Sequence, residues 1–252
     1  MSTMINSSLR AALTVMRREL SGYFSTPVAW VFIVIFLVMS GAFTFYIGSF
    51  FERGNADLAP FFQFNPWLYL FLVPAIAMRL WAEERRSGTI ELLLTLPLTT
   101  GQAVLGKFLA AWLFIGLALL LTFPIWLTVN YLGEPDNGII VAGYIGSWLM
   151  AGGFLAIGSC ISALTRNQVV AFILTVVVCF GFMLSGLPMV MNLFTGWAPQ
   201  ALLDVIADFS SLAHFASISK GVIDLRDLVY FALVITFWLA ANTIVLELKK
   251  AN

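Results

Sequence analysis

Long apolar runs, separated by short polar segments, dominate the chain. A soluble core of this size would carry polar residues at every helical period. These runs instead remain nearly free of charge over lengths close to or above the roughly 20 residues that cross a bilayer as a helix. The pattern predicts an all-α integral membrane protein, with one transmembrane domain over residues 1–252 and six transmembrane helices at 28–50, 61–81, 103–132, 139–164, 169–185 and 228–246.

The segment before the first predicted span, residues 9–24, has the pattern of an amphipathic helix. Apolar residues recur every three or four positions: Leu9, Leu13, Met16, Leu20 and Phe24. Polar residues fall on another face, and three arginines suit the segment to the headgroup region of a membrane. The segment has no short apolar core before a small-residue cleavage site, so we expect no removable signal peptide.

The stretch from Asn167 to Leu203 contains no charged residue, yet it is too long for a single crossing of the membrane. Glycine and proline interrupt it twice, at Gly186-Leu187-Pro188 and at Gly196-Trp197-Ala198-Pro199. Because these residues disfavour a continuing helix, the fifth predicted span ends at residue 185. Short re-entrant or external helices are expected between it and the last span.

Composition agrees with a membrane location. Apolar residues make up 61% of the chain and charged residues 10%, whereas an average soluble domain holds about 45–50% and 25%. The net charge is zero, so the charge balance indicates no nucleic-acid partner. Cys160 and Cys179 lie inside apolar runs without a CxxC or Cys/His spacing, and we expect them to pack as small hydrophobic residues.

The basic residues are distributed unevenly between the two sides of the predicted bundle. Segments that share a side with the N-terminus hold most of the 13, namely Arg10, Arg17, Arg18, Arg79, Arg85, Arg86, Lys107, Arg166, Lys249 and Lys250. The opposite loops hold Arg53, Lys220 and Arg226. By the positive-inside rule, both termini are therefore predicted to be cytoplasmic.

No ionisable residue falls in the middle of a predicted span. Ion-coupled carriers, proton pumps and voltage sensors keep such groups at membrane depth, although their burial costs about 2.5–3.5 kcal/mol on insertion scales. Arg79, Lys107 and Glu247 lie at predicted cytoplasmic ends, where long side chains reach back to the interface. If the protein moves a substrate uphill, we therefore expect the energy to come from another subunit. A passive channel and a structural anchor remain as alternatives.

Two further patterns indicate no enzyme chemistry. Gly101 to Lys107 fits GxxxxGK, but Phe108 replaces the Ser or Thr that holds magnesium in a P-loop, and no strand precedes it. His214 is the only histidine, which excludes an HExxH metal site, and we expect it to be solvated outside the membrane. The sequence therefore predicts no catalytic residue, no metal ligand and no cofactor-binding residue.

The polar segment between the second and third predicted spans, residues 83–98, combines charge with an apolar face. It begins with a charged cluster, turns at Ser87-Gly88, continues near Thr89 as a short helix and stops at Pro97. One side of this helix holds Ile90, Leu93 and Leu94. A helix that is polar at its start and apolar on one face suits docking into a groove of a partner. The alternative is an ordinary loop that lies on the headgroups.

Residues 83–97 follow the pattern EExxxGTxELLLTxP. This pattern resembles the segment between the second and third spans of ABC-2 type transporter permeases. Four further stretches carry the same resemblance in order along the chain: RELSGYFSTPVAW from Arg18, DLAPFFQFNPWLYLFLVPAIAMR from Asp57, LGKFLAAW from Leu105 and LTRNQVVAF from Leu164. Together they look most similar to the gliding-motility-type permeases of that family.

In that family, this segment includes the coupling helix, which sits in a cleft of the ATPase subunit. The resemblance implies that the residues coupling this chain to an ATPase are Glu83, Glu84, Gly88, Thr89, Glu91, Leu93, Leu94 and Pro97. A second cytoplasmic turn adds Thr165, Arg166, Asn167 and Gln168. The interface helix of the family corresponds to residues 9–24, and no residue of the substrate path is identified.

The resemblance implies a permease subunit of an ATP-driven transporter, an exporter in most of the family, in the inner membrane of a bacterium. Its implied partners are a separate ABC ATPase that binds ATP, a second identical or related permease, an accessory membrane protein with a large periplasmic domain, and the lipid bilayer. No nucleic acid is implied. The alternative function is a non-transport membrane component, through which the ATPase drives a conformational signal or a mechanical release.

Overall fold

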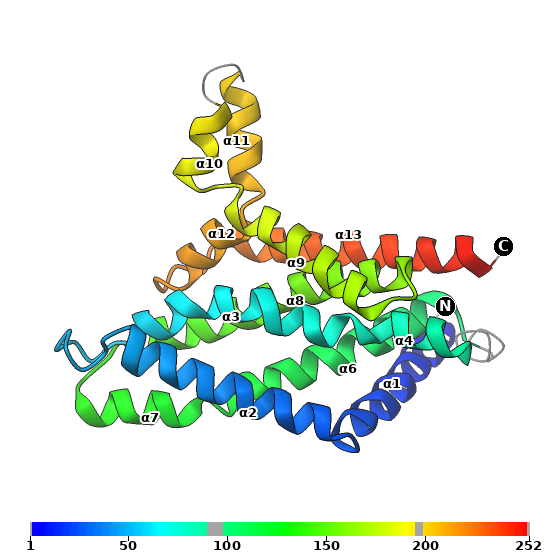
Figure 1. The fold of residues 1–252 in the computed structure, drawn as a ribbon, viewed down its shortest axis with the longest axis horizontal. Coiled ribbons are helices and arrows are strands. Elements are labelled where there is room, and N and C mark those ends of the chain that lie inside the picture. The colour runs from blue at the N-terminus through cyan, green and yellow to red at the C-terminus, as the bar shows by residue number, and fades with distance from the viewer. Residues whose placement is uncertain (1, 90–97, 195–198, 251–252) are drawn as a thin grey trace.

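The computed structural model describes residues 2–89, 98–194 and 199–250, and this part of the chain contains helices and no strand. The all-α prediction is confirmed. Figure 1 shows an elongated bundle with both chain termini at the same end of its long axis. We call this the terminal end; it is formed by α4, the starts of α6 and α9, and the ends of α8 and α13. The helices are α1 (Ser2–Phe24), α2 (Pro27–Ala42), η1 (Phe43–Ile47), α3 (Ala59–Ala77), α4 (Arg79–Ser87), α6 (Thr100–Leu120), α7 (Phe123–Leu132), α8 (Asn137–Leu164), α9 (Gln168–Leu184), α10 (Pro188–Phe194), α11 (Gln200–Asp208), α12 (Ser211–Ile218) and α13 (Leu225–Lys250).

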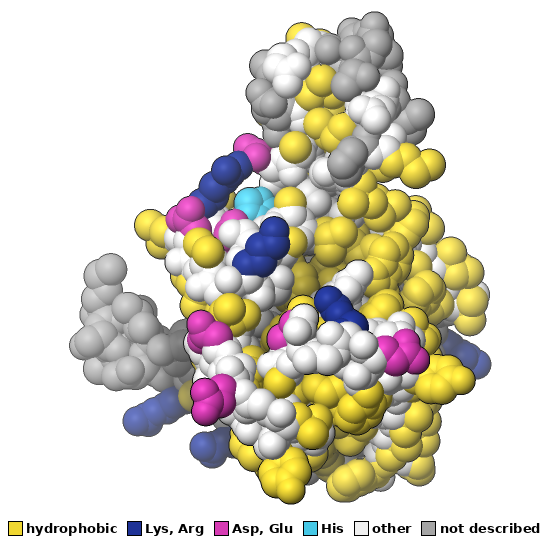
Figure 2. Space-filling view, turned by 90° about the vertical axis from the view of Figure 1, so that its left-hand side faces the viewer, with side chains coloured by type: hydrophobic (Ala, Val, Ile, Leu, Met, Phe, Trp, Pro, Cys, Tyr) yellow, Lys and Arg dark blue, Asp and Glu magenta, His cyan; other side chains and the backbone are white. Residues whose placement is uncertain are grey.

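Within the described residues, 5 helical stretches are long and apolar enough to cross a membrane: Pro27–Ile47, Ala59–Ser87, Thr100–Leu132, Asn137–Leu164 and Leu225–Lys249. The chain is therefore a multi-pass membrane protein. The helix at the remaining predicted position, α9, is apolar but shorter, and its crossing of the membrane stays a prediction. Figure 2 shows several acidic side chains on the end of the bundle away from the termini and hydrophobic side chains over its flank.

Three of the predicted spans are broken helices rather than continuous ones. The first contains the π-helix η1, where the buried Thr44 hydroxyl donates to a carbonyl one turn earlier at 2.6 Å. The second breaks at Met78, whose carbonyl accepts from Ser162 Oγ at 2.9 Å. The third breaks at Thr122, just before Pro124. Hydroxyls that bind main-chain carbonyls bend helices, and apolar periodicity does not reveal such contacts.

The central helix is α8, which contacts α3, α4, α6, α9, α12 and α13. Every residue from Met150 to Ala163 is buried. A Cβ on Gly152 would lie 2.8 Å from Trp112 Nε1, and a Cβ on Gly158 would lie 2.5 Å from Ala77 Cβ. The small residues of α8 therefore allow its neighbours to approach closely, and both cysteines are free thiols buried in this packing.

The N-terminal helix α1 packs along α6. It begins before residue 9, the predicted start. Ala12 and Val15 are buried in the contact, whereas Leu13, which its spacing assigns to the apolar face, is 43% exposed. A Cβ on Gly106 of α6 would lie 2.7 Å from Val15 Cβ. This glycine therefore permits the close approach that brings the last turns of α1 beside the start of α6.

A hairpin of two short helices, α10 and α11, projects sideways from the bundle between α9 and α12 (Figure 1). Short helices at this position agree with the sequence-based prediction. The two ends of the hairpin meet at Gly186 and Ser210. They approach so closely that a Cβ on Gly186 would lie 2.6 Å from Ser210 Cβ. Ser210 Oγ also donates to the Met183 carbonyl at 3.3 Å. Most of the second predicted break, residues 196–198, lies outside the described residues.

His214 is buried, which makes the prediction of a solvated histidine wrong. Its Nδ1 lies 2.6 Å from Asp227 Oδ1, and its Nε2 lies 3.0 Å from the Asp208 carbonyl. The Tyr230 ring stacks on the imidazole with the ring centroids 4.0 Å apart. The first two turns of α13 bring Asp227 and Tyr230 to the histidine. In the described part of the chain, no group of three or more His, Cys, Asp or Glu could hold a metal ion.

Candidate functional site

The first part of the predicted coupling segment forms the end of α4. Glu83 and Glu84 lie in this helix, which ends at Gly88 with a φ of +75°, a left-handed conformation that glycine adopts without strain. The Thr89 hydroxyl lies 2.9 Å from that of Ser87. The turn predicted at Ser87-Gly88 is confirmed. The other members of the set, Glu91, Leu93, Leu94 and Pro97, lie outside the described residues.

Lys107 joins three helices at the terminal end. Its Nζ lies 2.8 Å from Glu84 Oε1 of α4 and 3.2 Å from Glu19 Oε2 of α1. It also lies over the Trp81 ring, 5.3 Å from the centroid. The lysine side chain is 4% exposed, and the Glu84 and Glu19 side chains are 20% and 21% exposed. A buried ammonium requires such partners because an unpaired charge in an apolar site is costly. We call Glu19, Glu84 and Lys107 the triad.

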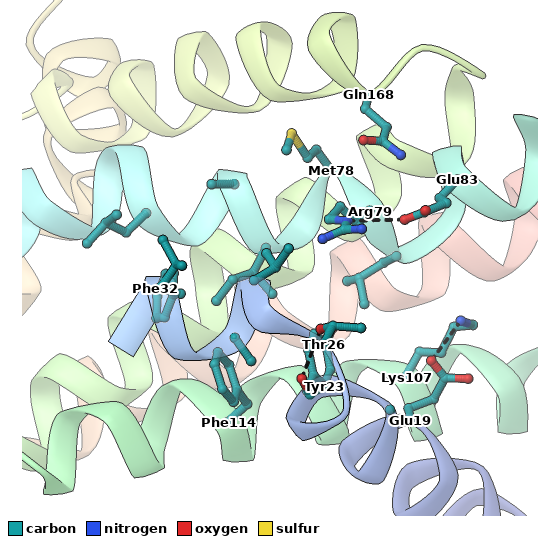
Figure 3. A pocket seen from close by; sticks show the side chains of 18 of the residues that line it. Glu19, Tyr23, Thr26, Phe32, Met78, Arg79, Glu83, Lys107, Phe114 and Gln168 are labelled. Atoms are coloured by element: carbon teal, nitrogen blue, oxygen red, sulfur yellow. Dashed lines mark hydrogen bonds and ion pairs between the residues drawn. The ribbon is translucent and has the colours of Figure 1, made fainter. Parts of the chain in front are cut away.

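The partners of Glu19 keep its carboxyl ionised. Burial raises the pKa of Glu19. The ammonium of Lys107 and the guanidinium of Arg18 together lower this pKa by more than burial raises it. Arg18 donates to Glu19 Oε1 at 2.8 Å, while Lys107 binds Oε2. The pKa of Glu19 therefore lies below its ordinary value, and this carboxyl is ionised at neutral pH. Figure 3 shows Glu19 facing Lys107 from the last turns of α1.

The structure bears on three interpretations of this region. Gly101 to Lys107 is part of helix α6 rather than a loop, and its lysine is bound to two carboxylates, so this segment is not built as a P-loop. The Lys107 side chain, which we expected to reach back to the interface, is buried against two carboxylates. Glu84, which we expected to face a partner, points inward to Lys107. Its neighbour Glu83 is 50% exposed and pairs with Arg79 at 3.1 Å.

Buried hydrogen bonds, which the sequence pattern does not reveal, hold α4 to α8. Ser162 Oγ accepts from the main-chain N–H groups of Trp81 at 3.1 Å and Ala82 at 3.0 Å. Ser159 Oγ accepts from Trp81 Nε1 at 3.1 Å and from Asn242 Nδ2 of α13 at 2.8 Å. An unpaired group at such a buried position costs about 1–3 kcal/mol. Two serines inside an otherwise small and apolar span are the signal that could have identified this contact.

The last carbonyls of α8 are bound by two basic side chains. Arg85 of α4 donates to the Ala163 carbonyl. Lys249 of α13 donates to the same carbonyl at 3.3 Å and to the Leu164 carbonyl at 2.6 Å. Cations at this position satisfy the free carbonyls and the negative end of the helix dipole. They also fix α4 and α13 to the point where the second predicted turn begins.

That second turn is an ordered connection from α8 to α9. The Asn167 N–H donates to Thr165 Oγ1 at 3.1 Å, and Asn167 Oδ1 accepts from the first N–H groups of α9 at 2.9 and 3.5 Å, which is an N-cap. Arg166 is exposed between them, and Gln168 is the first residue of α9. Because α4 contacts both α8 and α9, the two predicted coupling parts lie side by side at the terminal end.

Comparison with known proteins identifies the family of the chain. No curated protein matches it. The family model described as ABC-2 family transporter protein matches residues 13–222. The matched stretch contains the triad, the described part of the coupling segment and the whole second turn. It covers most of the 252 residues, so the match is not limited to one motif. The chain therefore belongs to the ABC-2 family of transporter proteins, as a permease that works in an ABC transporter.

Proposed function

We propose that the protein is the membrane-spanning subunit of an ATP-driven exporter and that a separate ATPase acts on residues 83–98 and 165–168. The triad is the observation that carries this proposal. Lys107 binds Glu84 of α4 and Glu19 of α1 at the same time. A displacement of α4 therefore acts directly on α1 and α6. This chain binds no ATP itself, because the nucleotide belongs to the partner.

The hydrogen bonds to α8 extend this connection into the bundle. Trp81 and Ala82 are hydrogen-bonded to Ser162, and Trp81 is also hydrogen-bonded to Ser159. Both serines lie in the fully buried part of α8. Force applied beyond Gly88 thus reaches α1, α6 and α8 through short buried contacts rather than through a flexible loop. In this proposal the exposed Thr89 and Arg166 meet the partner directly, and Glu84 acts inside the permease.

The proposed complex holds two permease copies, identical or related, and two ATPase subunits. In this arrangement the substrate path runs between the copies, both termini are cytoplasmic, and the complex lies in a bacterial inner membrane. An accessory membrane protein with a periplasmic domain completes it.

Replacing Leu93 and Leu94 together by alanine tests the docking of the ATPase. If both leucines fill a groove on the ATPase, their truncation costs about 2 kcal/mol or more and weakens assembly by over tenfold. The ATPase should then be lost when the permease is purified. The matched control replaces Leu120 and Leu121, which are 67% and 43% exposed at the other end of α6, and this control should retain the ATPase.

A third variant, Glu91→Ala, separates docking from coupling. Removing a carboxylate at the edge of the contact costs less than removing a buried leucine and depends on salt. The complex should persist at low and moderate salt, with reduced permease-stimulated hydrolysis. Full retention of the ATPase by the double leucine variant would refute the proposed docking segment and would favour a loop on the headgroups.

A further inference from the structure

A cavity of about 510 Å³ opens beside the triad. It lies between the bend that joins α1 to α2, one side of α3, the start of α4 and the first half of α6. Figure 3 shows that its two ends differ: Phe32 and Phe114 lie at one end, and Arg79, Glu83, Glu19 and Lys107 lie at the other. We call it the lateral cavity. Its volume falls within the roughly 300–1,000 Å³ typical of small-molecule sites.

The apolar half of the lateral cavity borders on the lipid-facing flank of the bundle. Its inner wall includes Phe32, Phe114 and Ile76, all buried. Its open side is bordered by Val28 and Val31 of α2, which are 49% and 54% exposed. In a multi-pass membrane protein, such exposed apolar residues contact acyl chains. The open side therefore gives an acyl chain direct access to the cavity.

The polar half carries both signs of charge and no net charge, since its lining contains Glu19, Glu83, Arg79 and Lys107. Lys107 is bound to two carboxylates. Arg79 binds Glu83 only through Nε, and neither of its Nη nitrogens has a partner in the described part of the chain. The guanidinium therefore keeps an open edge with two donors, which matches the spacing of two phosphate oxygens.

We propose that the lateral cavity binds a phospholipid with a phosphoethanolamine headgroup. The phosphate lies on the open edge of Arg79, and the ammonium lies beside the half-exposed carboxylate of Glu83. One acyl chain enters between Phe32 and Phe114, and the other follows the exposed face of α2. A headgroup with a net negative charge gains less, because Glu19 and Glu83 offset the two cations. Free phosphate leaves the apolar half of the cavity unfilled.

Two glycines provide a matched pair of variants. Gly22 lines the cavity from α1, whereas Gly41 lies in α2 and does not line it. A Cβ at either position would meet nothing within 4 Å, so the first carbon of a side chain displaces no neighbour in either helix. Gly22→Leu places a side chain in the space proposed for the acyl chain, and Gly41→Leu adds the same side chain elsewhere.

The test is native mass spectrometry of the purified protein, taken from nanodiscs that contain equal amounts of phosphatidylethanolamine and phosphatidylglycerol. The unaltered protein and Gly41→Leu should retain phosphatidylethanolamine in preference to phosphatidylglycerol. Gly22→Leu and Arg79→Gln should each retain about tenfold less, a loss near 1.4 kcal/mol. Equal retention of the two lipids by the unaltered protein overturns the proposed headgroup. Equal retention by Gly22→Leu and Gly41→Leu overturns the site.

The result does not depend on the proposed ATPase or on transport, because the measurement requires neither. Loss of the ATPase in the leucine variants therefore bears only on the coupling segment. Selective loss of lipid in Gly22→Leu, with the ATPase still bound, bears only on the lateral cavity.

Discussion

Lys107 Nζ and Glu84 Oε1, 2.8 Å apart, join the two helices that flank the predicted coupling segment. Glu84 lies four residues before Gly88, where α4 has ended, and Lys107 lies in the second turn of α6. At the far side of the segment, Thr99 and Gln102 form a capping box that starts α6. The segment is thus anchored at both ends to helices of the bundle, as the proposed coupling requires.

Breaking the triad should destabilise the protein. Lys107→Met leaves two carboxylates facing each other, and we expect the free energy of unfolding to fall by about 2–4 kcal/mol. This is below the ~3–5 kcal/mol for breaking a fully buried pair, because Glu84 and Glu19 are 20% and 21% exposed. Thermal unfolding in one detergent measures the change.

The control for that prediction is a double-mutant cycle with Glu84→Gln. Because the two groups are in contact, the combined variant should lose less stability than the sum of the single variants, by about 1 kcal/mol or more. Strict additivity of the two losses is incompatible with a functioning ion pair.

The contribution of Glu19 should depend on pH. Its folded-state pKa lies below the ordinary value of 4.5, so the stability it contributes is fully present above that value. This stability is lost as the pH falls below 4.5 through the folded-state pKa. The difference in unfolding midpoint between the unaltered protein and Glu19→Gln should therefore be constant above pH 5.5 or so and shrink in more acid buffer. A difference that grows on acidification would contradict this account.

The contacts of His214 with Asp227 and with the Asp208 carbonyl should hold the base of the α10–α11 hairpin. His214→Ala leaves the buried Asp227 without its partner, and we expect a loss of about 2–3 kcal/mol. Faster protease cleavage near Phe209 should accompany it, because Nε2 of His214 also binds the Asp208 carbonyl. Arg226→Ala is the control. The side chains of Arg226 and Asp208 are 64% and 61% exposed, so their ion pair should contribute no more than about 1 kcal/mol to the free energy of unfolding. Equal effects of the two variants would exclude a special role for His214.

Hydrophobic length indicated a multi-pass helical protein, and 5 helical stretches in the described part of the chain are long and apolar enough to cross a membrane. The same property did not indicate that three of the predicted spans are broken helices, at η1, Met78 and Thr122. The break at Met78 was missed because it depends on Ser162, which is 84 residues away in the sequence. A serine inside an apolar span indicates a buried contact, but the sequence alone does not identify a partner at that separation.

The charged residues show the same limit. Lys107 was expected to reach toward the interface because it lies at a predicted cytoplasmic end of a span, whereas its partner Glu19 lies 88 residues away in the sequence. Glu84 and Glu83 are adjacent and chemically identical, so the sequence could not tell that one points inward and the other outward. His214 was expected to be solvated because it lies outside the predicted spans. Its partner Asp227, 13 residues later, reaches it only through the turn before α13.

The central claim is that the ATPase contacts the end of α4, and site-specific photo-crosslinking tests it most directly. A photoreactive amino acid at Thr89, which is exposed beyond Gly88, should capture the ATPase subunit, identified by its peptides. The same amino acid at Asn137, exposed at the opposite end of the bundle, should not. Capture from Thr89 alone is the predicted result. Capture from Asn137 alone, from both positions or from neither would contradict the account.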